Sequence, residues 1–457
     1  RSPESAKIAQ SHTTALSGDD AVVDGAMRQA AVLRVDDEVD LVSAVQVVGM
    51  PLMKGRRVAV LSRSGGHAVL TADACAKYGF EMTPFPPSFI EKLKTIYNTR
   101  VIAHQNPLDL GEIFDYTIFT DILEEALKLD EFDGVLFNHL YSADFEGEMS
   151  RTFLTGVKEL VTRYEKPVSL AMISDREEIL DLQKKQPFPV FVSPLEAVEA
   201  LYVSRTYYEQ KTACQKRGHL EEYDLDLEAV LRIRARCKKE KRIPLTDEAL
   251  AICAAAGLQP VKSLLVKNEN APSRIALRYP LAAKLISRNA SHKSDVGGVV
   301  VNIRSKKQLS EALAGMKSKI RNLKPSPAID GYLIQQMAPA GVECFVGGRR
   351  DPAFGPVIVV GLGGIFIEIF KDTSIRLAPV TPREAEAMIR ELKAYPLLAG
   401  ARGRGPADCQ ALQNVVCRIS ALLAACPEIS EIDLNPVIVH PEGQGVSLVD
   451  ARVFFQK

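Results

Sequence analysis

The chain has 457 residues, 46% of them hydrophobic, and its 57 lysine and arginine residues equal its 57 aspartate and glutamate residues in number. This length exceeds what a single hydrophobic core usually serves, so two or three domains are expected. Because the formal net charge is zero, the composition favours neither nucleic acid nor an anionic membrane as a partner, and a small-molecule substrate is the better prediction.

The cysteines and the apolar stretches bear on the compartment. Eight cysteines form no CxxC pair and no regular framework, which predicts reduced thiols and a cytoplasmic protein. The uncharged stretch from residue 352 to residue 367 contains a proline inside it and four glycines, and it is shorter than the roughly 20 residues of a membrane-spanning helix. The chain starts at Arg1-Ser2-Pro3 without methionine or a signal-peptide pattern, which we interpret as a cut edge.

The first ordered region is predicted to be a doubly wound parallel sheet. A strand at 57–62 runs into the glycine-rich turn Ser64-Gly65-Gly66 and then into a helix of small apolar residues. Further strands and helices alternate along the chain, as expected for an α/β domain over residues 51–213. The strands are expected at 134–138, 168–172 and 189–192, and the helices at 117–129, 149–164 and 194–209.

Residues 214–243 are rich in charge and are interpreted as a linker that contains a solvated helix without a packing partner. The remainder, 244–457, is predicted to be a mixed α+β domain with a strand-rich second half. Its strands are expected at 259–266, 281–286, 298–303, 331–337, 342–348, 356–361 and 431–439, and its helices at 246–255, 307–321, 382–393 and 407–426.

Lys284 lies within the apolar strand Leu281-Ala-Ala-Lys-Leu-Ile286. A lysine buried there would be costly without an anion, which favours a phosphate ligand. The alternative is a lysine on an edge strand that reaches solvent along its aliphatic stem.

Two segments near the C-terminus offer oxygen ligands. In the strand pattern of 431–439, alternation places Asp433 and Asn435 on one face, and Asp450 lies in a second such segment. Carboxylate and amide oxygens suit Mg²⁺, which takes few protein ligands together with nucleotide phosphates.

These segments occur in the order of a known family. The stretches at 291–298, 354–357, 361–365, 432–436 and 449–452 closely resemble the ATP-grasp part of ADP-forming acetyl-CoA synthetases, relatives of succinyl-CoA synthetase. The resemblance covers residues 225–455. It implies that Lys284 binds ATP phosphates, that Asn435 and Asp450 hold Mg²⁺, and that Gln335, Gln336 and Met337 contact adenine. Many relatives have glutamate in place of Gln336.

The resemblance extends to the first half of the chain. Residues 11–18 resemble the phosphohistidine segment and imply a catalytic role for His12, although a histidine in such a polar turn is by itself more often a surface residue. The turn Ser64-Gly65-Gly66 matches a helix N-terminus that grips the phosphate on this histidine, and a plain βα turn is the alternative. His292 matches a second phosphoryl carrier on a swinging loop.

The implied fold is a flavodoxin-like CoA-ligase domain followed by an ATP-grasp domain, with residues 1–50 as the tail of a further ligase domain. The implied reaction converts a carboxylic acid, CoA and ATP into acyl-CoA, ADP and phosphate. The CoA-binding domain that precedes this region in relatives is expected in cis or as a separate subunit of an oligomer. Two alternatives stay open, an ATP-grasp carboxylate ligase without phosphohistidine and a non-catalytic nucleotide-responsive module.

Overall fold

The computed structural model describes residues 19–35, 37–96, 105–111, 113, 115–186, 188–268, 276–288, 297–321, 328–363, 372–403 and 405–456. It divides into two compact units, one spanning Ala30–Lys216 and the other combining residues up to Gln29 with residues from Arg217 onward. Among the described residues, no helix combines the length and the apolar character needed to cross a bilayer.

The unit Ala30–Lys216 is built on a parallel sheet with the strand order β2-β1-β3-β4. Its strands are β1 (Val58–Ser62), β2 (Leu108–Asp109), β3 (Gly134–Leu140) and β4 (Val168–Ile173). Phe191 continues the sheet through a single parallel bridge to Ala171. Every residue of β1 is buried, because helices cover both faces of the sheet.

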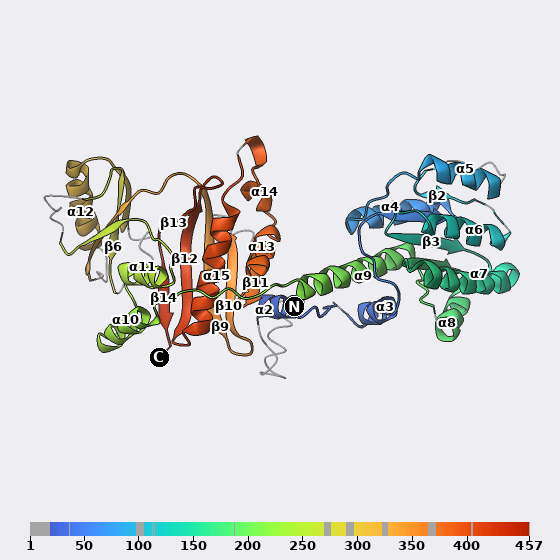
Figure 1. Cartoon of the computed structure of the whole chain (residues 1–457), viewed down its shortest axis with the longest axis horizontal. Coiled ribbons are helices and arrows are strands. Elements are labelled where there is room, and N and C mark those ends of the chain that lie inside the picture. The colour runs from blue at the N-terminus through green and yellow to red at the C-terminus, as the bar shows by residue number, and fades with distance from the viewer. Residues whose placement is uncertain are drawn as a thin grey trace. The chain divides into compact units, whose positions relative to one another are not determined.

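Two hydrophobic cores lie on opposite faces of this sheet. One core contains Leu61, Phe137 and Leu170 and is closed by α5 to α8. The other contains Val60, Leu136 and Ala171 and is closed by α3, α4 and α9. The predicted doubly wound α/β arrangement is therefore confirmed (Figure 1). The helices are α3 (Glu38–Val48), α4 (Gly65–Lys77), α5 (Pro87–Ile96), α6 (Tyr116–Leu127), α7 (Ala143–Tyr164), α8 (Arg176–Lys185) and α9 (Pro194–Gln215).

The second unit contains two largely antiparallel sheets. A four-stranded sheet has the order β5-β8-β6-β7 and packs one face on α12 (Lys306–Arg321). A six-stranded sheet has the order β11-β10-β9-β12-β13, with β14 also pairing β12, and α15 (Cys409–Ala425) packs against it. The strands are β5 (Ser263–Val266), β6 (Leu281–Ile286), β7 (Val299–Ile303), β8 (Gly331–Gln336), β9 (Val342–Asp351), β10 (Gly355–Leu362), β11 (Thr373–Leu377), β12 (Ile429–Val439), β13 (Val446–Leu448) and β14 (Arg452–Phe455).

The predicted helices of this unit appear with shifts of a few residues, as α11 (Thr246–Ala255), α12, α13 (Pro382–Arg390) and α15, and a short α14 (Tyr395–Leu398) follows α13. The two residues Thr381 and Glu384 form a reciprocal capping box at the start of α13, which satisfies backbone N–H groups that the first helical turn leaves without partners.

The prediction of a solvated helix without a packing partner in 214–243 is wrong. Helix α10 (Leu227–Lys239) packs on α11 and buries Val230, Ile233 and Cys237 in the same core as α15. These three residues recur at intervals of three and four, so they form one apolar stripe on a helix whose other faces carry charge. The charge density concealed this short stripe in the sequence.

The structure also places α2 (Asp20–Gln29) in this second unit. The helix packs against β11, the edge strand of the six-stranded sheet, and buries Val22, Gly25 and Ala26. Figure 1 shows α2 beside β11. This contact joins the start of the chain to a strand almost 350 residues later.

Candidate functional site

Lys284 lies on β6, an interior strand of the four-stranded sheet, and its side chain is only 7% exposed. The interpretation as an edge-strand lysine that reaches solvent is therefore wrong. Its Nζ donates a hydrogen bond to the backbone carbonyl of Val449 (2.8 Å) and lies 3.7 Å from Oδ2 of Asp450. The ammonium thus connects the four-stranded sheet to the segment between β13 and β14 of the six-stranded sheet.

Asp450 lies in a break between two short strands, because β13 ends at Leu448 and β14 begins at Arg452. Both strands pair with β12. On the other side of β12 the register against β9 shifts between Leu434 and Val437, so Asn435 lies where the ladder is irregular. Breaks of this kind re-aim side chains and free carbonyl groups from the ladder, as the hydrogen bond that Lys284 donates to the Val449 carbonyl illustrates.

Asp433 lies on β12 directly opposite Gly347 of β9 and Arg452 of β14. Burial raises the pKa of its carboxyl group; Arg452 opposes this shift, and Glu431 and Asp450 reinforce it. A Cβ on Gly347 would lie 3.2 Å from the carbonyl oxygen of Ile432 and 3.8 Å from Oδ1 of Asp433, so a side chain at this position would crowd the strand that carries the carboxylate. Asn435 is exposed, whereas Asp433 is half-buried.

The three residues implied to contact adenine lie at the end of β8. Gln335 is opposite Ala282 of β6, two residues from Lys284, so its side chain shares a face with the lysine. It is almost fully buried, and neither polar atom of its amide has a hydrogen-bond partner in the described part of the chain. A buried amide without partners fits a polar ligand on this face. Gln336 and Met337 are half-buried and donate backbone N–H groups to Lys262 and Pro280.

The structure confirms a βα turn at Ser64-Gly65-Gly66, at the carboxyl end of β1. Ser64 is the N-cap of α4, and its Oγ accepts from the backbone N–H of His67 (3.5 Å). Gly65 and Gly66 are exposed. The exposed start of a 13-residue helix offers backbone N–H groups and a positive dipole end to an anion.

The carboxylate of Asp109 lies beside this turn. A Cβ on Gly65 would lie 3.0 Å from Oδ2 of Asp109, and the other carboxylate oxygen accepts from Gly111 N–H (3.0 Å). Asn106, in the same loop, uses its amide to bond Val60 N–H and Val58 C=O of β1. Within residues 105–111, Asn106 therefore holds the segment to β1, and the carboxylate of Asp109 faces the turn.

A buried polar network lies at the same edge of the sheet. Arg63 pairs with Glu146 (3.0 Å), and both side chains are largely buried. Tyr116 donates to Glu146 and contacts Ser150, which in turn lies 3.0 Å from Nε2 of His139. Burial holds the pKa of His139 well below its usual value, so this histidine is neutral and structural.

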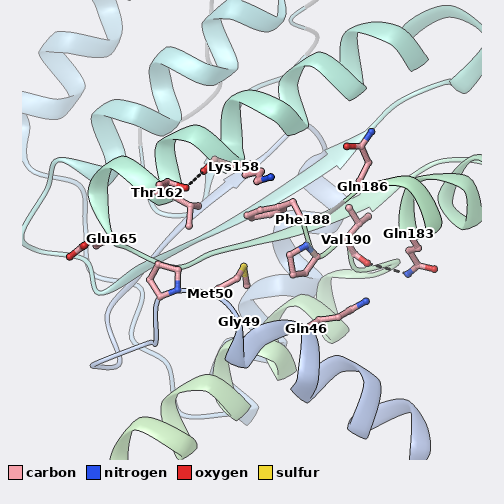
Figure 2. Close-up of a pocket in the computed structure, with 13 residues that line it drawn as sticks. Gln46, Gly49, Met50, Lys158, Thr162, Glu165, Gln183, Gln186, Phe188 and Val190 are labelled. Atoms are coloured by element: carbon pink, nitrogen blue, oxygen red, sulfur yellow. Dashed lines mark hydrogen bonds between the residues drawn. The ribbon is translucent and has the colours of Figure 1, made fainter.

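The unit Ala30–Lys216 also contains a pocket of about 500 Å³. Figure 2 shows Met50 and Phe188 at its centre, with Gln46, Gln183 and Gln186 around them. It lies at the amino-terminal edge of the sheet, where α7 ends before β4 begins, and the glycine-rich turn lies at the carboxyl edge. None of the predicted site residues lines this pocket.

Two central predictions, His12 and His292, lie outside the described residues. Within the described part of the chain, no group of three or more histidine, cysteine, aspartate or glutamate side chains gathers as a metal site. A magnesium site formed by Asn435 and Asp450 would contain only one side chain of these four types. It would take its remaining ligands from water and phosphate.

Comparisons with known proteins match two parts of the chain. A model of the ATP-grasp domain matches residues 236–455, and a model of the succinyl-CoA ligase like flavodoxin domain matches residues 1–48. A solved acetyl-coenzyme A synthetase 1 chain from Ca. Korarchaeum cryptofilum, in complex with coenzyme A, Ca-AMPCP and HgCl+, is 36% identical. It covers 49% of this chain and 99% of its own, with a TM-score of 0.46.

Two curated relatives match almost the whole chain. The 4-hydroxybutyrate–CoA ligase [ADP-forming] of Nitrosopumilus maritimus is 30% identical, and the acetate–CoA ligase [ADP-forming] I of Archaeoglobus fulgidus is 32% identical. Each match covers 99% of this chain, and the chain spans 65% and 64% of these relatives. The beta subunit of acetate–CoA ligase [ADP-forming] I from Pyrococcus furiosus is 40% identical over 48% of this chain and 94% of its own length. The chain therefore belongs to the family of ADP-forming acetate–CoA and acyl-CoA ligases.

Proposed function

We propose that the chain carries the nucleotide-binding and phosphoryl-carrying part of an ADP-forming acid–CoA ligase. The complete reaction interconverts a carboxylic acid, CoA and ATP with acyl-CoA, ADP and phosphate. The observation that carries this proposal is the buried ammonium of Lys284, held between the Val449 carbonyl and the Asp450 carboxylate. A buried lysine ammonium is suited to bind a nucleotide phosphate.

The residues around Lys284 fit a magnesium nucleotide. Asn435 and Asp450 would hold Mg²⁺ at the irregular part of β12 and the break after β13, and the ion would neutralise phosphate charge when bound. Gln335 has a buried amide without partners in the described part of the chain, on the face that carries Lys284. This chain's own contribution is to position the phosphates and to offset their charge.

His12 and His292 are proposed as the phosphoryl carriers. The imidazole nitrogen of His292 attacks the γ-phosphorus, ADP leaves, and a phosphorus–nitrogen bond forms. The imidazole nitrogen of His12 then attacks this phosphorus, and the imidazole of His292 leaves. A carboxylate oxygen of the acid then attacks this phosphorus, the imidazole leaves, and an acyl phosphate results. The thiol sulfur of CoA attacks the acyl carbon, its proton goes to solvent, and phosphate leaves. Each transfer exchanges bonds of similar energy, which supports a reversible reaction.

The turn at Ser64, Gly65 and Gly66 is proposed to grip the phosphoryl group of the carrier at the ligase end of this path. Exposed backbone at a helix start supports this role. The carboxylate of Asp109 beside Gly65 would compete with the phosphoryl group for the backbone N–H groups. Phosphate is therefore expected to bind more weakly here than at Lys284.

The CoA-binding part is proposed to pack on α3, either in cis or as a separate subunit. Helix α3 lies within the segment that matches the succinyl-CoA ligase like flavodoxin domain, and it buries Ala44 and Val47 while Leu41, Val42 and Val45 are 53%, 58% and 69% exposed. Such a stripe of apolar side chains is typical of a surface that another part covers. The eight free cysteines support a reducing, cytoplasmic location.

The function is tested by CoA-dependent phosphate release. The protein is combined with its CoA-binding part, MgATP, CoA and a panel of acetate, branched-chain, aryl and dicarboxylic acids. We expect phosphate release that requires both CoA and at least one acid, with acyl-CoA formed in equal amount. Transfer to an amine without CoA would favour the carboxylate ligase without phosphohistidine, and ATP binding without release would favour a regulatory module.

The docking on α3 is tested by binding. Val45→Asp places a charge at an exposed position, so the chain alone keeps its unfolding temperature while its affinity for the CoA-binding part falls. The matched control, Ala30→Asp, lies at an exposed position outside the helix. Equal affinities of the two variants would contradict the proposed surface.

A further inference from the structure

His440 is a buried histidine that the proposed function does not use. It follows β12 directly and is only 5% exposed. Its Nε2 lies 2.8 Å from Oγ of Ser447 on β13, and its Nδ1 lies 3.4 Å from the carbonyl oxygen of Ala340. Because a carbonyl oxygen only accepts hydrogen bonds, Nδ1 carries the hydrogen, and in the neutral ring the Ser447 hydroxyl donates to Nε2. The ring therefore connects a strand to a distant backbone carbonyl.

Ala340 lies in the segment 337–341, which joins the two sheets of this unit. The segment leaves β8 of the four-stranded sheet and enters β9 of the six-stranded sheet. At its end, Gly341 approaches β12 so closely that a Cβ would lie 2.4 Å from the carbonyl oxygen of Val439. The segment is therefore fixed to the end of β12 by backbone packing at Gly341 and by the ring of His440 at Ala340.

The same hairpin contacts the four-stranded part of the unit at two further points. The backbone N–H of Val261, two residues before β5, donates to the carbonyl of Leu448 (3.1 Å). Nζ of Lys284 donates to the carbonyl of Val449 (2.8 Å). The three consecutive residues 447–449 thus carry all three connections. A phosphate that binds Lys284 would compete with the Val449 carbonyl for the ammonium, and the other two connections would then keep the sheets in place.

We propose that His440 is a positioning residue for nucleotide binding, which acts through the segment 337–341. This segment continues from the end of β8, where the buried amide of Gln335 shares a face with Lys284. A nucleotide has a fixed reach from its phosphates to its base, so both of its sites must be held at one separation. Losing the contact at Ala340 would move the base site and leave the lysine in place. This inference rests on the proposed function.

The test compares MgATP with magnesium tripolyphosphate, which carries phosphates without a base, by calorimetry on the chain. Two variants separate the ring nitrogens, because an asparagine amide can take the position of Nδ1 and a glutamine amide that of Nε2. His440→Gln should weaken MgATP binding about fivefold, the range of one hydrogen bond, and leave tripolyphosphate binding unchanged. His440→Asn should keep both parental affinities. His219→Gln, at an exposed histidine, is the matched control and should change neither affinity.

A merely structural role of the ring would lower both affinities together or lower neither, and either result in His440→Gln overturns the proposal. An equal loss of MgATP affinity in His440→Gln and His440→Asn overturns it as well. Lys284→Ala tests the proposed function separately, because it should weaken both ligands. Unchanged affinities in that variant would overturn the phosphate role of Lys284. A loss of both ligands there, with parental MgATP binding in His440→Gln, would overturn the positioning role alone.

Discussion

The two candidate phosphate sites of this chain would attract phosphate through different interactions. At Lys284 a full positive charge is buried inside a sheet and held by a carbonyl and a carboxylate. At Ser64 an exposed helix start offers only partial charges, and the Asp109 carboxylate lies beside the first glycine. A buried charge binds an anion strongly, whereas a helix dipole contributes modestly and is screened at the surface. The first site is suited to retain a nucleotide, and the second to hold a phosphoryl group briefly.

The largest expected effect is at the buried charge. Lys284→Ala should lower the rate of ATP-dependent protein phosphorylation by about a hundredfold or more, as is typical when a preorganised charge-stabilising group is removed. Rapid quench with labelled ATP measures it. Lys267→Ala, at an exposed position directly after β5 in the same sheet, is the matched control and should keep the parental rate. Equal rates for both variants would contradict a phosphate role for Lys284.

A smaller effect is expected at the magnesium ligands. Asp450→Asn keeps an oxygen ligand but removes its charge, so the Mg²⁺ concentration for half-maximal phosphorylation should rise about tenfold, the range seen when groups that support a metal site are altered. A titration with MgCl₂ at fixed ATP measures it. Glu442→Gln, which removes an exposed carboxylate nearby in the sequence, should leave the titration unchanged. An unaltered midpoint for Asp450→Asn would place the metal elsewhere.

At the start of α4, removing a charged group should strengthen phosphate binding instead of weakening it. Asp109→Asn removes a negative charge from the turn, so inorganic phosphate should bind about fivefold more tightly, which corresponds to about 1 kcal/mol for a screened charge at the surface. Calorimetry in a Lys284→Ala background isolates this site. Asp130→Asn, at an exposed position of the same unit, serves as control. Weaker binding in Asp109→Asn would show that the carboxylate supports the site.

The smallest expected effect concerns stability and pH. Because burial raises the pKa of Asp433, the folded chain keeps this proton to higher pH than the unfolded chain. Burying this group therefore does not lower the free energy of unfolding below the pKa of the unfolded state. The free energy of unfolding falls as the pH rises through the pKa of the folded state. Asp433→Asn should unfold at a higher temperature than the parent at pH 7 and at the same temperature at pH 3. Scanning calorimetry would contradict this if the difference were larger at pH 3.

The sequence predicted most elements because their patterns are local. The strand around Lys284 and the helices α11 and α12 follow from apolar periodicity, and the turn at Ser64 follows from its glycines after a buried strand. Strand β11 was missed because its buried Arg376 reads as a surface residue, and the structure shows that Glu391 pairs with it. Burial of a charge is decided by a partner 15 residues away, which no local pattern contains.

The geometry of the sites depends on contacts between distant segments. The break around Asp450 arises from pairing with β12, and the proximity of Asp109 to Gly65 arises from the parallel pairing of β1 and β2. Likewise, no local pattern indicates that Gly25 in α2 lies against β11, where a Cβ would come 2.5 Å from the carbonyl oxygen of Ile375. The residue types alone predict which side chains could bind a ligand. Strand register and packing determine which of these side chains lie close together.

The most direct test of the central claim follows phosphorus from the nucleotide to the protein. The chain is mixed with γ-labelled MgATP and quenched in acid and in base. The account predicts a base-stable, acid-labile label that is lost in Lys284→Ala and in the double variant His12→Ala, His292→Ala. A label that survives acid, or one that persists in the double variant, would contradict transfer through histidine.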